Sequence, residues 1–169
     1  MRPSKDQYYL NIALEVAARS TCLRRSYGAI IVRDDQIVST GYNGSPRGTP
    51  NCADLGYCIR ELNKIPPGER YELCRGVHAE QNAIINAARA GVSVLRGTIY
   101  ISGVDAKTRL ILSENYLTPC RLCSRMIINA GLLEAKTPHT TFSIEQLAKM
   151  SDYIDPKMVG GRSRLRLSP

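Results

Sequence analysis

Residues 28–42 have the sequence GAIIVRDDQIVSTGY and predict a β-hairpin, from which the fold can be built outward. Two runs, 28–33 and 36–42, are rich in the β-branched residues typical of strands. Asp34 and Asp35 lie between the runs, where aspartate favours a tight turn. The hairpin therefore supplies two neighbouring strands of a sheet.

Helix and strand patterns flank this hairpin on both sides. Ser4 and Gln7 match a capping box that opens a helix ending near Arg19. The order α-β-β-α-β-α is typical of a three-layer α/β domain, in which helices flank a mixed central sheet. Residues 132–141 contain proline and several threonines and do not predict a strand. The other predicted elements are helices over 77–91, 118–131 (capped by Thr118) and 143–150, and a strand over 97–102.

The composition is that of one globular domain. A chain of 169 residues, 43% hydrophobic and 22% charged, excludes a disordered chain, a fibrous repeat and a coiled coil. No apolar run approaches the length of a membrane span and the N-terminus lacks a signal-peptide pattern, so we expect a cytoplasmic protein. We expect a domain over 1–155 that contains a long Cys-rich insertion at 43–75, followed by a basic, flexible tail over 156–169.

The net charge of +8 is divided between this tail and the domain. The tail carries four basic residues and no acid, which is typical of a solvated chain end rather than a nucleic-acid arm. The remaining positive charge of the domain suits a small anionic ligand such as a phosphate, and it does not require a polyanion.

Two short motifs, His78-Ala79-Glu80 and PCRLC at 119–123, carry the predicted chemistry. Each lies in the first turn of a predicted helix, where free N–H groups and the helix dipole favour thiolates. Cys120 and Cys123 are three positions apart, so both sulfurs lie on one helix face. With His78 they make a set of one nitrogen and two sulfurs, which suits zinc and leaves a fourth position for water.

Glu80 lies two positions from His78 and is the candidate general acid and base, because it can take and return protons beside an activated water. One alternative is a core histidine with a structural cysteine pair. Another is a zinc-organised binding protein without turnover, such as a DNA-uptake or assembly factor, which would have no need of an acid at position 80.

The H-x-E and P-C-x-x-C motifs match the known signature of zinc-dependent nucleobase deaminases. The chain resembles the deoxycytidylate (dCMP) deaminase branch of the cytidine deaminase superfamily over about residues 8–133. The resemblance implies a cytidine-deaminase-like fold and the hydrolysis of dCMP to dUMP and ammonia, which supplies dUMP for dTMP synthesis. The matching stretches are 20–22, 28–32, 41–44, 78–84, 119–123 and 127–131.

The resemblance also implies a role for each residue of the two motifs. His78, Cys120 and Cys123 would hold the catalytic zinc, and water ionised there would attack C4 of the cytosine ring. Glu80 would protonate N3 and then pass a proton to the departing ammonia.

Asn43, Arg24 and Ala79 are the implied substrate-binding residues, with Asn43 contacting the nucleoside and Arg24 suited to grip its phosphate. The alternatives are a turn role for Asn43 and a surface charge at Arg24. Relatives often respond to dCTP and dTTP through a second nucleotide site and form hexamers of paired subunits, so we expect a homo-oligomer, hexamer or dimer. The residues that fit the effector site are Gly41, Gly44, Ser45 and Arg47.

The remaining cysteines form a candidate structural zinc site, since four thiolates suit a tetrahedral zinc ion. A second zinc would explain how the 43–75 insertion stays folded without a core of its own. Some family members place second-zinc ligands at positions matching the first two of these cysteines. Free buried thiols are the alternative. The four residues are Cys22, Cys52, Cys58 and Cys74.

The chain departs from the family pattern at 104–117, where relatives lead almost directly into the Pro-Cys motif. This insertion would lie beside the catalytic pocket, so the substrate could differ from the family norm. The alternatives are another free base and a base in tRNA or single-stranded DNA. A polymer substrate is the weaker of these, because stacking on nucleic acid needs aromatic side chains and the chain has no Trp and one Phe.

Overall fold

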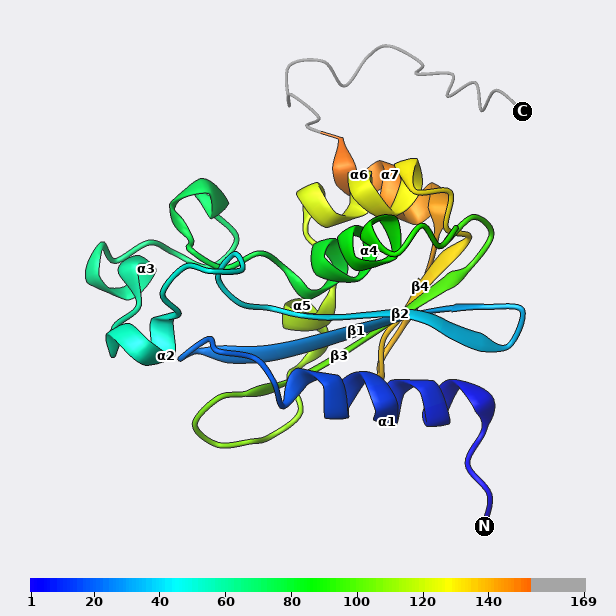
Figure 1. The fold of residues 1–169 in the computed structure, drawn as a ribbon, viewed down its shortest axis with the longest axis horizontal. Coiled ribbons are helices and arrows are strands. Elements are labelled where there is room, and N and C mark those ends of the chain that lie inside the picture. Colours follow the sequence, from blue (N-terminus) through cyan, green and yellow to red (C-terminus); the bar gives the residue numbers. More distant parts are fainter. Residues whose placement is uncertain (153–169) are drawn as a thin grey trace.

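The computed structural model describes residues 1–152, which form a five-stranded sheet between two layers of helices (Figure 1). The strand order is β2-β1-β3-β4-β5; β3 and β4 are parallel, and the other neighbours are antiparallel. This arrangement confirms the predicted α/β class. The main elements are α1 (Lys5–Ala17), β1 (Arg25–Arg33), β2 (Gln36–Tyr42), α4 (Ala79–Arg89), β3 (Thr98–Asp105), α5 (Glu114–Leu117), α6 (Arg121–Asn129), β4 (Glu134–Lys136), β5 (Thr141–Ser143) and α7 (Ile144–Ser151).

The predicted hairpin forms as β1 and β2, and its turn uses the left-handed backbone of Asp34 and Asp35, with φ of 51° and 62°. Side chains of β1 alternate between the two faces of the sheet. Ala29 and Ile31 pack in the core under α4, whereas Ile30 packs against α1. Because both faces of β1 are apolar and buried, helices are needed on both sides of the sheet.

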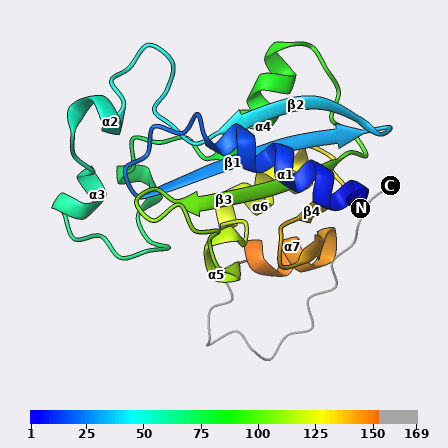
Figure 2. The same cartoon turned by 90° about the horizontal axis from the view of Figure 1, so that it is seen from below.

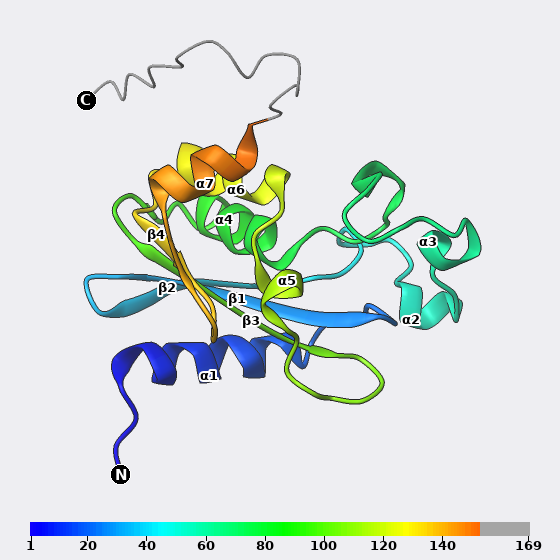
Figure 3. The ribbon, with the colours of Figure 1, turned by 180° about the vertical axis from the view of Figure 1, so that it is seen from behind.

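Helix α1 covers one face of the sheet, and α4, α6 and α7 cover the other (Figures 1 and 3). Two glycines allow the helices to approach the strands closely. A Cβ at Gly28 would overlap the backbone carbonyl of Ala13 in α1, and one at Gly41 would overlap the backbone of Ala83 in α4. The first turn of α4, which carries His78 and Glu80, is therefore held directly against β2.

Two sequence-based expectations are wrong. Residues 134–136 form β4, because Ala135 enters the core beside β3 and the chain turns at Pro138 to return as β5. These strands have three residues each, too short for an alternating pattern to show. Thr118 does not cap α6: it ends α5, and Cys120 is the cap residue of α6.

The 43–75 segment contains α2 (Cys52–Leu55), α3 (Ile59–Leu62) and a 3₁₀ helix at Tyr71–Leu73. Figure 2 shows α2 and α3 beyond the end of the sheet where β1 begins and β2 ends. The buried Arg60 donates hydrogen bonds to the carbonyl oxygens of Pro66 and Arg70, each at 2.8 Å. Polar contacts from one buried guanidinium thus help to fold a segment that has little apolar core.

No helix among residues 1–152 is both long enough and apolar enough to cross a membrane. The predicted tail over 156–169 lies outside the described residues, as does the predicted domain boundary at residue 155.

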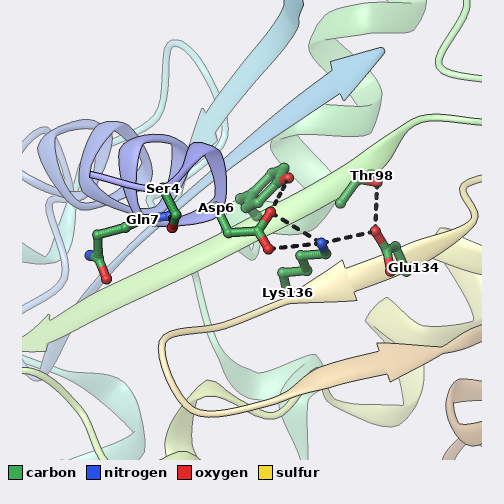
Figure 4. A network of polar contacts seen from close by, with 7 residues as sticks. Ser4, Asp6, Gln7, Thr98, Glu134 and Lys136 are labelled. Carbon is green, nitrogen blue, oxygen red and sulfur yellow. Dashed lines mark hydrogen bonds and ion pairs between the residues drawn. The ribbon is translucent and has the colours of Figure 1, made fainter. Parts of the chain in front are cut away.

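A polar network joins the start of α1 to the middle of the sheet (Figure 4). The ammonium of Lys136 on β4 lies 3.0 Å from the Asp6 carboxylate and 3.3 Å from that of Glu134. Asp6 also accepts a hydrogen bond of 2.8 Å from the Tyr100 hydroxyl. Burial acts to raise the pKa of Asp6, but the hydrogen bonds from Tyr100 and Lys136 outweigh it and lower the pKa.

Asp6→Asn is expected to lower the free energy of unfolding by only about 0.5 kcal/mol at pH 7, because half-exposed ion pairs are screened by solvent. The folded-state pKa of Asp6 lies below its ordinary value of 3.8, so its stabilising contribution is complete above pH 4 and is lost as the pH falls further. Urea unfolding between pH 7 and pH 3 measures the free energy of unfolding of the wild type and of the variant. The two values should become equal at the acid end of this range. A difference that stays constant, or grows, below pH 4 would contradict this assignment.

Candidate active site

Two of the candidate metal ligands, His78 and Cys120, immediately precede helices. His78 lies before α4 and Cys120 before α6, both with extended backbone at ψ of 156° and 165°. The His78 N–H donates to Oε1 of Gln81 at 3.0 Å, and Cys120 Sγ accepts from the Cys123 N–H at 3.5 Å. The local hydrogen bonds of the two helix starts thus fix the backbone at His78 and orient the Cys120 thiol.

Packing of α4 against α6 brings the three predicted ligands together. His78 Nδ1 lies 3.5 Å from Cys120 Sγ and 3.3 Å from Cys123 Sγ, and the three ligand atoms lie within 4.8 Å of one another. Ligand bonds of roughly 2.1 and 2.3 Å to a tetrahedral zinc would separate nitrogen and sulfur by about 3.6 Å. The spacing and the chemistry of this set therefore fit zinc. Residues 1–152 contain no second cluster of three ligands at such distances.

The thiols of this cluster share their protons unequally. Hydrogen bonds from Cys123 and His78 outweigh burial and lower the pKa of Cys120 to about 4. The pKa of Cys123 is raised well above its ordinary value by its bond to Cys120 and by burial. The thiolate form of Cys120 is thus already favoured at neutral pH, whereas Cys123 keeps its proton. A metal cation is the natural replacement for that proton.

Glu80 lies in the first turn of α4 with only 8% of its surface exposed. Its carboxyl group and the Cys123 thiol influence each other's pKa, so Glu80 lies close to the candidate metal ligands. Burial raises the pKa of Glu80, and the charge of Cys120 acts in the same direction. A carboxyl group that accepts a proton more readily than usual suits an acid–base role.

His78, Glu80 and Cys120 line a cavity of about 390 Å³, within the range of roughly 300–1,000 Å³ usual for ligand pockets. The 43–75 segment forms one wall, and its Tyr71 meets the His78 ring edge-on at 5.2 Å between ring centres. The 104–117 insertion forms another part of the wall through Asn115 and Tyr116. Its expected place beside the pocket is therefore confirmed.

All three predicted substrate-binding residues line the same cavity. The Asn43 side chain is already bonded to β1: Nδ2 donates to the Arg25 carbonyl at 2.9 Å, and Oδ1 accepts from the Tyr27 N–H at 2.7 Å. Nε of Arg24 lies 3.6 Å from the Glu61 carboxylate. Ala79 is fully buried at the wall of the cavity.

The residues suggested for an effector site do not form one cluster. Gly44 and Ser45 line the catalytic cavity, and the Ser45 hydroxyl oxygen is buried without a hydrogen-bond partner among the described residues. Gly41 packs under α4, and Arg47 donates to Oδ1 of Asn86 in that helix. An unpartnered hydroxyl in the cavity is a candidate contact for a ligand there.

The four remaining cysteines also lie along this cavity. Burial raises the pKa of the Cys52 thiol. The charges of the other three cysteines raise this pKa as well, so the four thiols are near neighbours. No three of their sulfur atoms are as close together as the atoms of the His78 cluster. The structural zinc site stays a prediction.

Several polar residues of the cavity are missing from the sequence-based set, among them Arg25, Arg60 and Tyr71. Arg25 is adjacent to the predicted Arg24, and nothing in the sequence distinguishes one arginine from the other. Arg60 and Tyr71 lie in a segment without periodicity, so their orientation depends on contacts made only in the folded chain.

The sequence matches the family described as the cytidine and deoxycytidylate deaminase zinc-binding region over residues 3–137. It is 34% identical over 144 residues to a deoxycytidylate deaminase of Schizosaccharomyces pombe, covering 85% of this chain but 39% of that relative. It is 35% identical over 136 residues to the deoxycytidylate deaminase of Mycobacterium phage D29, covering 78% of this chain and 91% of the phage protein.

Among solved structures, the fold is similar to that of a dCMP deaminase from the cyanophage S-TIM5 in complex with dCMP and dUMP. The TM-score is 0.58 at 25% identity, and the match covers 89% of this chain and 95% of that one. The predicted cytidine-deaminase-like fold is thereby confirmed. With the family's zinc-binding region matched and its three ligands brought together, the chain belongs to the cytidine and deoxycytidylate deaminase family.

Proposed function

We propose that this protein is a zinc enzyme that hydrolyses dCMP to dUMP and ammonia. The observation that carries the proposal is the buried Glu80 beside the His78–Cys120–Cys123 cluster on the wall of an arginine-lined cavity. The deoxycytidylate deaminases among its relatives, and the similar phage enzyme solved with dCMP and dUMP, support this choice of substrate.

When bound by these three residues, zinc would supply a water activated for attack on C4 of the cytosine ring. Glu80 takes the proton released by the water and delivers it to N3. It then takes the proton of the hydroxyl newly bonded to C4 and passes it to the exocyclic amino group, so the C4–N bond breaks as ammonia leaves and C4 keeps the oxygen as a carbonyl. The buried position of Glu80 keeps its proton within the cavity between these transfers.

Ammonia release from dCMP, CMP, deoxycytidine and dCTP at equal concentration tests this function. We expect the highest kcat/KM with dCMP. Arms with added dCTP and dTTP test the proposed effectors. Absence of ammonia from all four compounds, with zinc bound, would overturn the proposed substrate and direct the search to other bases and to tRNA.

We also propose a second, structural zinc held by Cys22, Cys52, Cys58 and Cys74; their shared position along one cavity wall supports it. Wild-type protein is then expected to contain two zinc ions per chain by elemental analysis. Cys58→Ser and Cys74→Ser should each contain about one, with lower thermal stability and the deamination chemistry retained. One zinc in the wild type, or two in both variants, would contradict the second site.

A further inference from the structure

The Arg25 side chain stacks on an aromatic ring from a distant part of the chain. Arg25 is the first residue of β1, and its guanidinium carbon lies 3.7 Å from the centre of the Tyr116 ring. Tyr116 belongs to α5, within the 104–117 insertion, and both side chains line the cavity that contains Glu80. The insertion thus lines the cavity directly and also contacts Arg25 of β1 there.

The cavity has three arginines and, apart from Glu80, no acidic residue among the side chains that line it. Arg60 donates to the carbonyl oxygens of Pro66 and Arg70. Arg24 pairs with Glu61. Arg25 is the arginine of this wall whose guanidinium makes no hydrogen bond or ion pair with the described residues, so its donors are available to a ligand.

Asp105 is a candidate counter-charge, because it is paired with Arg25 across β1 and β3 and the charge of Arg25 helps to lower the pKa of its carboxyl group. Its carboxylate oxygen Oδ1 instead accepts hydrogen bonds from the backbone N–H groups of Lys107 and Thr108, at 3.0 and 2.9 Å. The turn that follows β3 thus engages this carboxylate. Among the described residues Asp105 forms no ion pair with Arg25, whose guanidinium lies on the cavity wall.

Stacking fixes the plane of a guanidinium without using its N–H groups, which lie in that plane and point away from the ring edge. A planar pair of donors held in this way matches two oxygens of a phosphate. The Tyr116 ring reduces the conformational freedom that a free arginine would lose on binding, which improves the affinity of the site.

We propose that Arg25, oriented by Tyr116, binds the 5′ phosphate of the nucleotide and makes the enzyme selective for nucleoside monophosphates over nucleosides. This inference rests on the proposed deaminase function and deepens it. It assigns the phosphate to Arg25, where the family resemblance suggests Arg24. The 104–117 insertion, which departs from the family pattern, then contributes a positioning residue to substrate selection.

The test compares kcat/KM for dCMP with kcat/KM for deoxycytidine, since the two substrates differ only in the phosphate. Arg25→Met is expected to lower the ratio of the two about 100-fold, because a charged, paired set of hydrogen bonds is lost. Tyr116→Leu should lower the ratio about 5-fold, and Tyr116→Phe, which keeps the ring face, should restore it.

Lys107→Met is the matched control, because it removes the same charge from an exposed position of the same insertion. It should leave the ratio unchanged. A large fall with Arg24→Met in place of Arg25→Met would overturn the assignment. If Arg25→Met lowers kcat/KM equally for dCMP and for deoxycytidine, Arg25 has a structural role, and the phosphate assignment is overturned as well.

Failure of the inference and failure of the proposed function are distinguishable in the wild type. Equal kcat/KM for dCMP and deoxycytidine would leave the deaminase function intact and overturn the phosphate site. If neither compound releases ammonia, the proposed function fails, and calorimetric titration with dUMP and deoxyuridine decides the inference. Tighter binding of dUMP to wild type than to Arg25→Met supports it, and equal binding overturns it.

Discussion

Glu80→Gln is expected to lower kcat for ammonia release by about 10³- to 10⁴-fold while zinc stays bound. Glutamine has nearly the same shape as glutamate, so the buried position beside Cys123 can be filled without a cavity. The amide cannot accept the proton of water and deliver it to N3, so both proton transfers lose their carrier. Steady-state kinetics with dCMP and elemental analysis of zinc on the same preparation measure the two effects.

Glu145→Gln is the control for the loss of one negative charge, because Glu145 is an exposed residue of α7 paired with Lys149 at 2.8 Å. It should retain full activity. Unchanged kcat in Glu80→Gln with zinc bound would remove the acid–base role of Glu80. Loss of zinc from Glu80→Gln would show instead that the carboxylate supports the metal cluster.

Cys123→Ser is expected to lose the catalytic zinc and, with it, measurable deaminase activity. Cys123 is fully buried between Cys120 and Glu80, and a serine hydroxyl is a much weaker zinc ligand than a thiolate. Loss of a metal present at 100 to 1,000 times its dissociation constant lowers the free energy of unfolding by about 3–4 kcal/mol. Zinc content, activity and thermal unfolding of the variant measure these effects.

Wild-type protein stripped by a chelator is the matched reference for Cys123→Ser. The stripped protein should unfold at a similar temperature to the variant, and added zinc should restore stability and activity to the wild type alone. A variant that keeps the zinc content and the activity of the wild type would show that Cys123 is not a ligand.

The metal cluster could be predicted from the sequence because its geometry is largely local. Cys120 caps α6 and Cys123 lies in its first turn, whereas His78 caps α4 and Glu80 lies in its first turn, so two short motifs define most of the site. The sequence could not show the pairing of α4 with α6. The resemblance to a known family supplied that part of the prediction.

The hairpin and the longer helices were predictable for a related reason. Their apolar periodicity and their turn and cap residues lie within a few positions of one another, as at Ser4, whose hydroxyl accepts the Gln7 N–H at 3.1 Å. In contrast, β4 exists because Ala135 finds room beside β3, and the orientation of Arg60 depends on carbonyls of a loop. Such features depend on tertiary contacts, which local pattern does not encode.

The loop after β2 shows the same limit at the scale of single residues. Gly44, Ser45 and Arg47 are close in sequence, yet two of them line the cavity while Arg47 bonds to α4. Consecutive residues of an irregular segment project in different directions, so a contiguous motif there does not define one binding surface.

The separation of the ligands along the chain has a consequence for how the protein is made. His78 is 42 positions from Cys120, and the two meet only after the chain between them has crossed the sheet as β3 and docked α6. During synthesis, His78 emerges before the two cysteines and offers only one of the three candidate ligands, so tight capture of zinc waits until α4 and α6 are in place. Metal uptake then serves as a late step of folding that closes a long loop.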